Sequence, residues 1–240
     1  MDRALDVLAA VAAGRASAGV SEIAERTGLY KSSVHRLLAT LERRGFVQRD
    51  AKTDKYRIGL AVLELASAFS RDDDLTSLAY PEMERLRNEI DETVSLYVRD
   101  GTERVRVQKA ESRQAVRRVV QIGQRAPLYL GASGKVLLAF APPEVREQVL
   151  DSPLREGIDR SRLREQLAEL ARQGWASSVE EREPGSAAVA APVFDGSGEV
   201  VAALAVSGPS GRFDPEIIAR YGQAVIEAAQ RISRLLAWRQ

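Results

Sequence analysis

Residues 31–44 carry side chains that can hydrogen-bond to nucleic acid, and they recur at a helical spacing. One predicted face is apolar and consists of Val34, Leu37, Leu38 and Leu41. The opposite face is polar and holds Lys31, Ser32, Ser33, His35, Arg36 and Thr40. Arginine can donate two hydrogen bonds to guanine, while Ser, His and Lys donate to bases or phosphates. The pattern predicts a helix that reads the DNA major groove; for such a helix taken alone, a solvated polar face is the alternative.

Two shorter helices are predicted before this segment. The first covers residues 3–13, and its buried stripe consists of Leu5, Leu8 and Val11, with Val7 beside them. The second begins with Ser21 as its N-cap and ends at Gly28. In a helix-turn-helix the second helix of the pair enters the major groove, so residues 31–44 occupy the recognition position.

A basic hairpin is predicted directly after the recognition helix. Residues 46–49 and 55–58 have the composition of two short strands, and the polar segment 50–54 joins them. This hairpin would form the wing of a winged helix-turn-helix over residues 1–59. The side chains expected to lie along the DNA backbone there are Arg49, Lys52 and Lys55.

The rest of the chain predicts a linker and a second domain. Residues 60–69 return to a helical period, and the acidic run Asp72-Asp73-Asp74 predicts a hinge, which gives a linker over 60–74. The second domain is expected over residues 75–240. It begins with a helix over 75–90, and three strands follow over 93–98, 104–109 and 116–122. Three helices are then predicted over 133–140, 144–150 and 160–173. Two further strands over 187–194 and 200–206 and a last helix over 215–236 complete the domain. This order is typical of an α+β domain built on an antiparallel sheet.

The composition argues against an enzyme, a metal site or a cofactor. The chain has no cysteine and a single histidine, His35, on the predicted recognition helix, so neither a His/Cys metal cluster nor a Ser-His-Asp triad is available. Adjacent Glu180 and Glu181 would point to opposite faces of a strand. An enzyme with an accessory winged helix is the alternative function, and it would depend on Asp, Glu, Lys or Tyr.

Charge is distributed unevenly along the chain. Residues 1–71 contain 12 Lys and Arg against 8 Asp and Glu, whereas the remainder contains 23 against 26. A mildly basic head on a mildly acidic body suits a DNA-binding head. No apolar run is long enough to span a membrane and no export signal is visible, so we expect a cytoplasmic protein.

Many short segments resemble the IclR family of transcriptional regulators, and they occur in the same order along the chain. In the first half the resemblance lies in Arg3-Ala4-Leu5, in the run from Thr27 to Leu38, and in Tyr56-Arg57-Ile58-Gly59. In the second half it lies in Pro127-Leu128, Gly134-Lys135, Gly174-Trp175, Glu180-Glu181, Pro184-Gly185, Ala190 to Val193 and Val206 to Pro209. The resemblance implies a GAF-like effector-binding domain and a homodimer or homotetramer. It also implies repression or activation of a catabolic operon through double-stranded operator DNA.

The same resemblance implies an effector site made of small residues: Ala132, Ser133, Ser178, Ser186, Ala188, Ala205 and Ser207. Small side chains beside Val and Leu walls would leave room for a ligand with an apolar body, so an aromatic or medium-sized carboxylic acid is expected. Backbone N–H groups near Ser133 and the hydroxyls of Ser178 and Ser207 would hold its polar end. The alternative is close packing of the sheet with no cavity.

Four positions depart from the family pattern. Tyr30 replaces a proline before the recognition helix and offers a phenol that could contact phosphate. Ala188 replaces a cysteine, Ser178 replaces an aspartate of the members that bind keto acids, and Tyr129 replaces a histidine. These changes argue against a keto acid as the effector.

Overall fold

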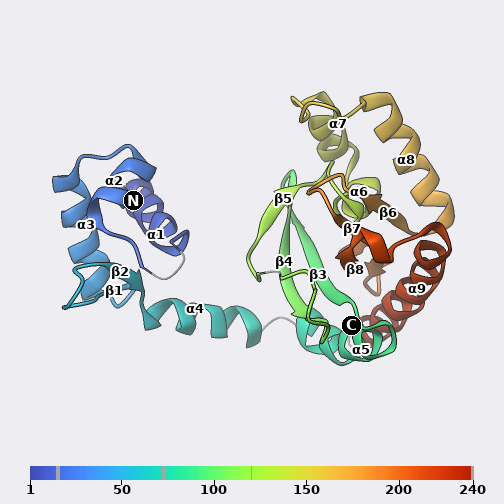
Figure 1. The fold of residues 1–240 in the computed structure, drawn as a ribbon, viewed down its shortest axis with the longest axis horizontal. Helices are drawn as coiled ribbons and strands as arrows, with labels where there is room; N and C mark the ends of the chain where they lie inside the picture. The colour runs from blue at the N-terminus through green and yellow to red at the C-terminus, as the bar shows by residue number, and fades with distance from the viewer. Residues whose placement is uncertain (15–16, 72–73, 120, 239–240) are drawn as a thin grey trace. The chain divides into compact units, whose positions relative to one another are not determined.

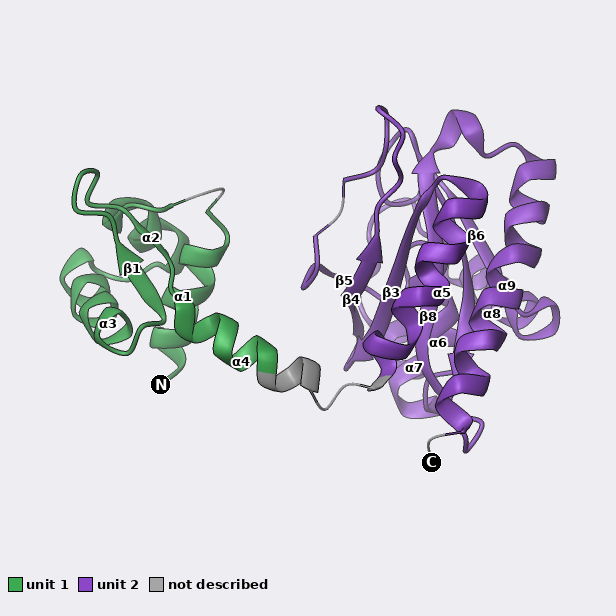
Figure 2. Cartoon of the chain, turned by 90° about the horizontal axis from the view of Figure 1, so that it is seen from below, with its two compact units in different colours: residues 1–73 green, residues 74–240 purple. Residues whose placement is uncertain are grey.

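The computed structural model describes residues 1–14, 17–71, 74–119 and 121–238, and the chain forms two compact units. Unit 1 spans Met1–Asp73 and unit 2 spans Asp74–Gln240 (Figure 2). Of the expected hinge, Asp72 and Asp73 lie outside the described residues, and Asp74 is already the first residue of a helix.

Unit 1 is a winged helix-turn-helix (Figure 1). Its elements are α1 (Asp2–Ala12), α2 (Val20–Thr27), α3 (Lys31–Arg43), β1 (Val47–Arg49), β2 (Tyr56–Ile58) and α4 (Leu60–Arg71). β1 and β2 pair antiparallel as the wing. Gly28 adopts a left-handed φ of 66°, which turns the chain sharply between α2 and α3. The core is formed by α1, α2, α3 and the wing, and it includes Val7, Ile23, Val34, Leu38 and Tyr56.

Two predicted details of unit 1 are wrong. Leu5 is 57% exposed, whereas Val11 is buried as predicted, together with Val7 and Ala10. Apolar residues surround most of this helix, so their period alone does not select the face that packs on α2 and α3. Ser21 is not the N-cap of α2, because Gly19 holds that position. Ala18, one residue earlier, is paired to Tyr56 by two backbone hydrogen bonds, so the extended chain ends there and the helix begins at once.

Unit 2 is built on a six-stranded antiparallel sheet in the order β5-β4-β3-β8-β7-β6. The strands are β3 (Thr93–Asp100), β4 (Glu103–Ala110), β5 (Arg125–Pro127), β6 (Ala176–Val179), β7 (Ser186–Phe194) and β8 (Val200–Pro209). The helices are α5 (Asp74–Ile90), α6 (Ala132–Ala139), α7 (Pro143–Asp151), α8 (Arg160–Gln173) and α9 (Pro215–Ala237), with a short 3-10 turn, η1 (Ser210–Arg212). This α+β architecture is the one expected from the sequence.

The central strands alternate between two cores. On β8, Leu204 and Val206 pack with α5 and α9, whereas Ala203 and Ala205 pack with α6 and α8 on the other face. Figure 1 shows these helices around the sheet. β7 follows the same period: Val189 and Val193 face α9 together with two alanines, whereas Ala188 and Ala190 face α6. The small residues expected at the effector site are therefore gathered on one face.

The predicted strand over 116–122 is wrong. Among its described residues none is in a strand, and the edge strand β5 follows later at Arg125–Pro127. Val116 and Val119 are exposed, so their apolar character does not reflect packing in the sheet.

The strand β6 was not predicted, and Glu180 and Glu181 lie in a turn after it rather than in a strand. Glu180 takes a left-handed φ of 56° in that turn.

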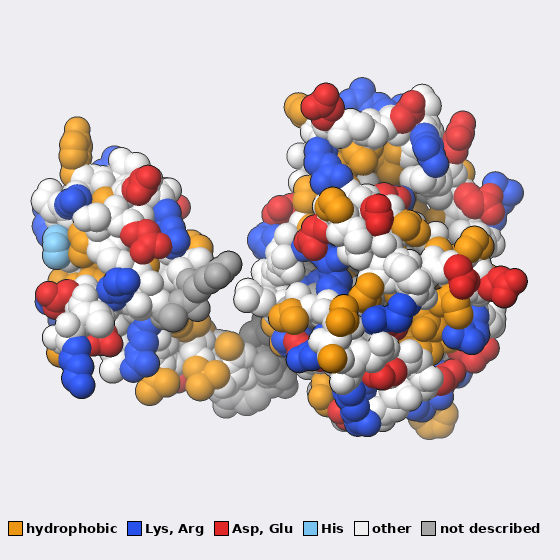
Figure 3. All heavy atoms as spheres, viewed as in Figure 1, with side chains coloured by type: hydrophobic (Ala, Val, Ile, Leu, Met, Phe, Trp, Pro, Cys, Tyr) orange, Lys and Arg blue, Asp and Glu red, His pale blue; other side chains and the backbone are white. Residues whose placement is uncertain are grey.

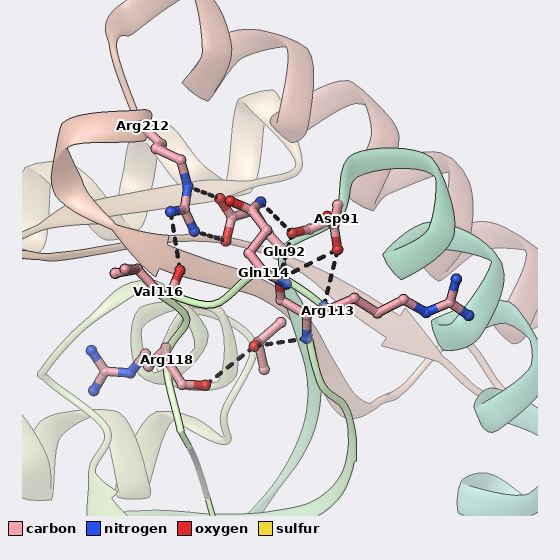
Figure 4. Close-up of polar contacts among 9 residues, drawn as sticks. Asp91, Glu92, Arg113, Gln114, Val116, Arg118 and Arg212 are labelled. Atoms are coloured by element: carbon pink, nitrogen blue, oxygen red, sulfur yellow. Dashed lines mark hydrogen bonds and ion pairs between the residues drawn. The ribbon is translucent and has the colours of Figure 1, made fainter.

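Residues 111–119, called the strap below, are fixed to the start of β3 by polar contacts (Figure 4). The Asp91 carbonyl accepts hydrogen bonds from Ser112 Oγ and Gln114 Nε2, both at 2.7 Å. Thr93 Oγ1 donates to the Arg118 carbonyl at 3.2 Å. The strap is therefore tied to residues 91–93, which join α5 to the sheet.

A buried ion pair holds the same region from the other side (Figure 4). Glu92 is 1% exposed, and its carboxylate accepts two hydrogen bonds from Arg212, at 2.5 and 2.8 Å. Arg212 Nη1 also donates to the Val116 carbonyl at 3.1 Å. The Glu92 carboxylate raises the pKa of Arg212 through these hydrogen bonds, so the guanidinium stays charged. The pair joins β3, the strap and η1.

Replacing Arg212 by Met should destabilise unit 2. The change leaves the Glu92 carboxylate buried without its cation, which lowers the free energy of unfolding by about 3 kcal/mol. The control Arg172→Met breaks an exposed pair with Glu169 and should lower it by less than about 1 kcal/mol. Urea denaturation of both variants measures the difference, and equal losses would show that the buried pair does not brace the fold.

Candidate functional site

The expected DNA-reading face of α3 is largely open to solvent. Lys31, Ser32, His35, Arg36 and Thr40 are exposed, and Ser33 is half-buried beside them. Tyr30, the N-cap of α3, is 85% exposed, so its phenol is accessible. Val34, Leu38 and Leu41 are buried as predicted, and Leu37 is half-buried. The helix thus presents its polar side outward.

The wing presents its basic residues on an ordered turn. Asp50 Oδ1 accepts backbone hydrogen bonds from Lys52 and Thr53, which hold the tip and lower the pKa of Asp50. The Lys52 and Lys55 side chains are exposed, whereas Arg49 is paired with Asp54 at 2.9 Å. On the face that Figure 3 shows, basic and acidic side chains are mixed over unit 1, so positive charge there is not gathered in one patch.

All seven residues expected at the effector site line one small pocket in unit 2, with a volume of about 30 Å³. The strand register explains how they meet. Ala188 is paired with Ser178 on one side and with Ser207 on the other, so these three form a row across β6, β7 and β8. Ala132 and Ser133 come from the start of α6, which packs on this face.

The pocket also contains residues that the sequence did not predict: Tyr97, Arg104, Arg118, Gly131, Arg182 and Ala187. We call this site the arginine pocket. The expected Val and Leu walls are wrong, because Val189 and Val206 point to the opposite face of the sheet. The lining combines small side chains with one tyrosine and three arginines, which suits a charged ligand better than an apolar one.

Arg104 is the most deeply buried of the three arginines, with 2% of its surface exposed. It donates to the carbonyls of Pro127 and Leu130, and its Nε has no hydrogen-bond partner within the described structure. Burial lowers the pKa of Arg104 to about 10, while nearby Tyr97 opposes this shift. No carboxylate of the described residues forms an ion pair with Arg104, so it is a buried cation without an anion.

The other two arginines reach the pocket from separate segments. Arg118 belongs to the strap and Arg182 to the turn 180–185, and both contact the Glu183 carboxylate, at 2.9 and 3.5 Å. A fourth arginine, Arg106, lies against Tyr97 and donates to its hydroxyl, and burial lowers its pKa as well. Positive charge therefore exceeds negative charge around the pocket.

The start of α6 is held by β6 and the turn after it. Ala132 N donates to Ser178 Oγ at 3.1 Å, and Gly131 N donates to Glu181 Oε2 at 3.2 Å. The buried Lys135 pairs with Glu181 at 2.5 Å. Glu181 is thus engaged in structure rather than free for acid-base chemistry. The first turn leaves the N–H groups of Ser133 and Gly134 without intrahelical acceptors, beside the pocket.

A second, wider groove of about 410 Å³ lies between α8 and β6 and is open to solvent. Its two most buried charged side chains are Lys135 and Glu181, which already pair with each other. Within the described ranges, no group of three or more His, Cys, Asp or Glu side chains could hold a metal ion, and no helix is long and apolar enough to cross a membrane. The arginine pocket is the stronger candidate site.

Two family models match the chain and cover most of it. Residues 1–51 match the IclR helix-turn-helix domain, and residues 68–234 match the C-terminal domain of the bacterial transcriptional regulator IclR. The HTH-type transcriptional regulator KipR of Bacillus subtilis is 35% identical over 91% of this chain and 90% of its own length. The HTH-type transcriptional regulator BhcR of Paracoccus denitrificans is 35% identical over 97% of this chain and 85% of its own length.

Solved structures give the same result. The IclR of Thermotoga maritima is 30% identical, with a TM-score of 0.79 and 98% coverage of each chain. An IclR homologue from Microbacterium hydrocarbonoxydans, crystallised with 4-hydroxybenzoate, is also 30% identical, with a TM-score of 0.85 and coverage of 98% of this chain and 97% of the homologue.

Replacing Gly134 by Ala should disrupt the arginine pocket. A Cβ atom there would lie 2.5 Å from the Leu128 carbonyl oxygen and would overlap the Arg104 guanidinium, so α6 must shift. We expect a loss of about 1–3 kcal/mol in unfolding free energy. The control Gly211→Ala adds a Cβ in open space and should change stability by less than about 0.5 kcal/mol. Thermal denaturation compares the two; a neutral Gly134→Ala would contradict the close packing of Arg104 beneath α6.

Proposed function

Since this chain belongs to the IclR family of bacterial transcriptional regulators, we propose that a small carboxylate binds its arginine pocket and changes operator binding by unit 1. The chain is a DNA-binding transcription regulator rather than an enzyme, as its relatives are. The observation that carries the proposal is Arg104, a buried guanidinium with no carboxylate partner within the described structure.

A carboxylate ligand would satisfy this cation. Burying a charge is unfavourable unless it is paired and hydrogen-bonded, so an anion beside Arg104 gains more than it would in water. Ser178, Ser207 and the N–H groups at the start of α6 supply further donors. The Microbacterium relative was crystallised with an aromatic carboxylate, which supports a carboxylate as the effector class.

For operator binding we propose that α3 reads base edges and the wing contacts phosphates. Arg36 would fork to a guanine, and Tyr30 and Lys31 would contact the DNA backbone at the start of α3. One such helix reads few bases, so a symmetric dimer or tetramer on a pseudo-palindromic site is the proposed arrangement. The cytoplasm, which holds bacterial operator DNA, is the proposed place of action.

We propose that the strap carries the effector signal. Arg118 lines the pocket, while its carbonyl is bonded to Thr93 and the strap is tied to Asp91 at the end of α5. α5 follows α4 in the chain, and α4 follows the wing. Suppose that the strap and the end of α5 can adopt two conformations, and that the ligand contacts Arg118 better in one of them. The ligand then shifts the protein toward that conformation, by no more than the difference in its affinity for the two.

Arg36→Ala should weaken operator binding and relax specificity. Loss of a two-donor contact to guanine costs about 1–3 kcal/mol at one base position. The matched variant Lys52→Ala should weaken all sequences equally and lower the salt dependence by about one phosphate contact. Fluorescence anisotropy on operator variants at two salt concentrations separates the effects; an Arg36→Ala protein with unchanged base preference would overturn the assigned register of α3.

Carboxylates should stabilise the protein through Arg104. At a ligand concentration of 100 times Kd the free energy of unfolding rises by about 2.7 kcal/mol, which differential scanning fluorimetry detects. The probes are 4-hydroxybenzoate, pyruvate and glyoxylate, each as its sodium salt against sodium chloride. Arg104→Gln and, as a milder change, Ser207→Val should abolish the shift, whereas exposed Arg172→Gln should keep it. A shift that survives in both pocket variants would place the ligand elsewhere.

A further inference from the structure

The charges around the arginine pocket exceed what one carboxylate can neutralise. Its lining contains three guanidinium groups and no Asp or Glu. Within the described structure the one carboxylate that contacts any of the three is Glu183, and it serves both Arg118 and Arg182. Arg118 and Arg182 also lower the pKa of Arg104 by charge repulsion. A ligand with a single carboxylate beside Arg104 would leave Arg118 and Arg182 dependent on the half-exposed Glu183 alone.

The three arginines form two separate anchoring points. Arg104 comes from β4 and lies beneath the start of α6, where Gly131 approaches it closely. Arg118 and Arg182 come from the strap and from the turn 180–185, and their shared partner Glu183 is about half exposed. One anchor is thus buried, and the other lies at the rim with an internal carboxylate already in place.

We propose that the effector is a short dicarboxylate. One carboxylate pairs with Arg104, and the second displaces Glu183 from Arg118 and Arg182. This inference rests on the proposed function and narrows its ligand class. In this structure Glu183 occupies the place assigned to the second carboxylate, where Arg118 of the strap reaches the carboxylate that follows Arg182 in the turn. At about 30 Å³ the pocket is smaller than any diacid, so we restrict the proposal to short skeletons, those of malonate and succinate, whose entry requires Glu183 and the turn 180–185 to move outward.

Matched ligands test the second charge directly. Isothermal titration calorimetry of the full chain compares malonate with malonamate and succinate with succinamate, because each monoamide keeps the shape and loses one charge. We expect the better dicarboxylate to bind at least 10-fold more tightly than its monoamide. An amide that binds as tightly as its diacid would overturn the inference.

Variants of the rim test the assigned anchor. Arg182→Gln should bring the diacid-to-monoamide affinity ratio to within about 3-fold. Glu183→Gln should tighten dicarboxylate binding by about 3-fold or more, because the competing internal carboxylate is gone. The Glu183 backbone carbonyl, which accepts from Ser186, is not altered by this change. Arg172→Gln is the control for loss of an exposed arginine, and Arg118→Gln is the second rim variant.

The outcomes separate the inference from the proposed function. If pyruvate or 4-hydroxybenzoate binds and neither diacid does, the dicarboxylate is wrong and the carboxylate effector stands. If no carboxylate of either class binds a protein that still binds DNA, both are wrong. If Glu183→Gln weakens diacid binding, Glu183 does not occupy the place of the second carboxylate, and the rim anchor is refuted.

Discussion

A guanidinium buried beneath the start of α6 is the constraint on which the effector half of this regulator depends. Arg104 donates to the carbonyls of Pro127 and Leu130, so it holds the connection between β5 and α6. That position leaves no room for a side chain at Gly134, which is why a glycine stands inside the first turn of a helix. Burying a charge is unfavourable unless it is paired and hydrogen-bonded. A buried cation without an anion is therefore the reason for proposing that a ligand anion binds beside Arg104.

The period-two alternation of the central strands then determines what the pocket can hold. Large side chains such as Val206 fill the core beneath α5 and α9, and the small ones such as Ala205 face α6. Small residues allow α6 to approach the sheet, while the arginines enter from β4, the strap and the turn 180–185. The resulting site is lined by small side chains and by three positively charged arginines. If the proposed effector binds there, the segments that limit its size differ from those that select its charge.

The sequence predicted elements well where one period was unambiguous. α8 was predicted at its observed bounds, and the winged helix-turn-helix order and the α+β sheet domain were correct. Residues 116–122 were wrongly predicted as a strand, because apolar residues there are exposed and the segment is held by polar contacts that leave no periodic signal. The seven small pocket residues came from family resemblance. Arg104 was missed, because a buried arginine in a strand has the same pattern as an exposed one, and only the pairing of distant segments distinguishes them.

The balance between repulsion and pairing in the pocket suggests how such a site can act as a switch. Arg118 and Arg182 share one carboxylate, and Arg104 has none within the described structure. Like charges held close in a poorly solvated site raise the free energy of that conformation, and an anion lowers it again. The strap bears Arg118 and is bonded to residues 91–93, so the conformation with the lowest electrostatic energy can differ at the end of α5 with and without ligand. The ratio of ligand affinities for those two conformations then limits how far a ligand can shift the equilibrium between them. A few-fold ratio gives graded rather than complete control of that equilibrium.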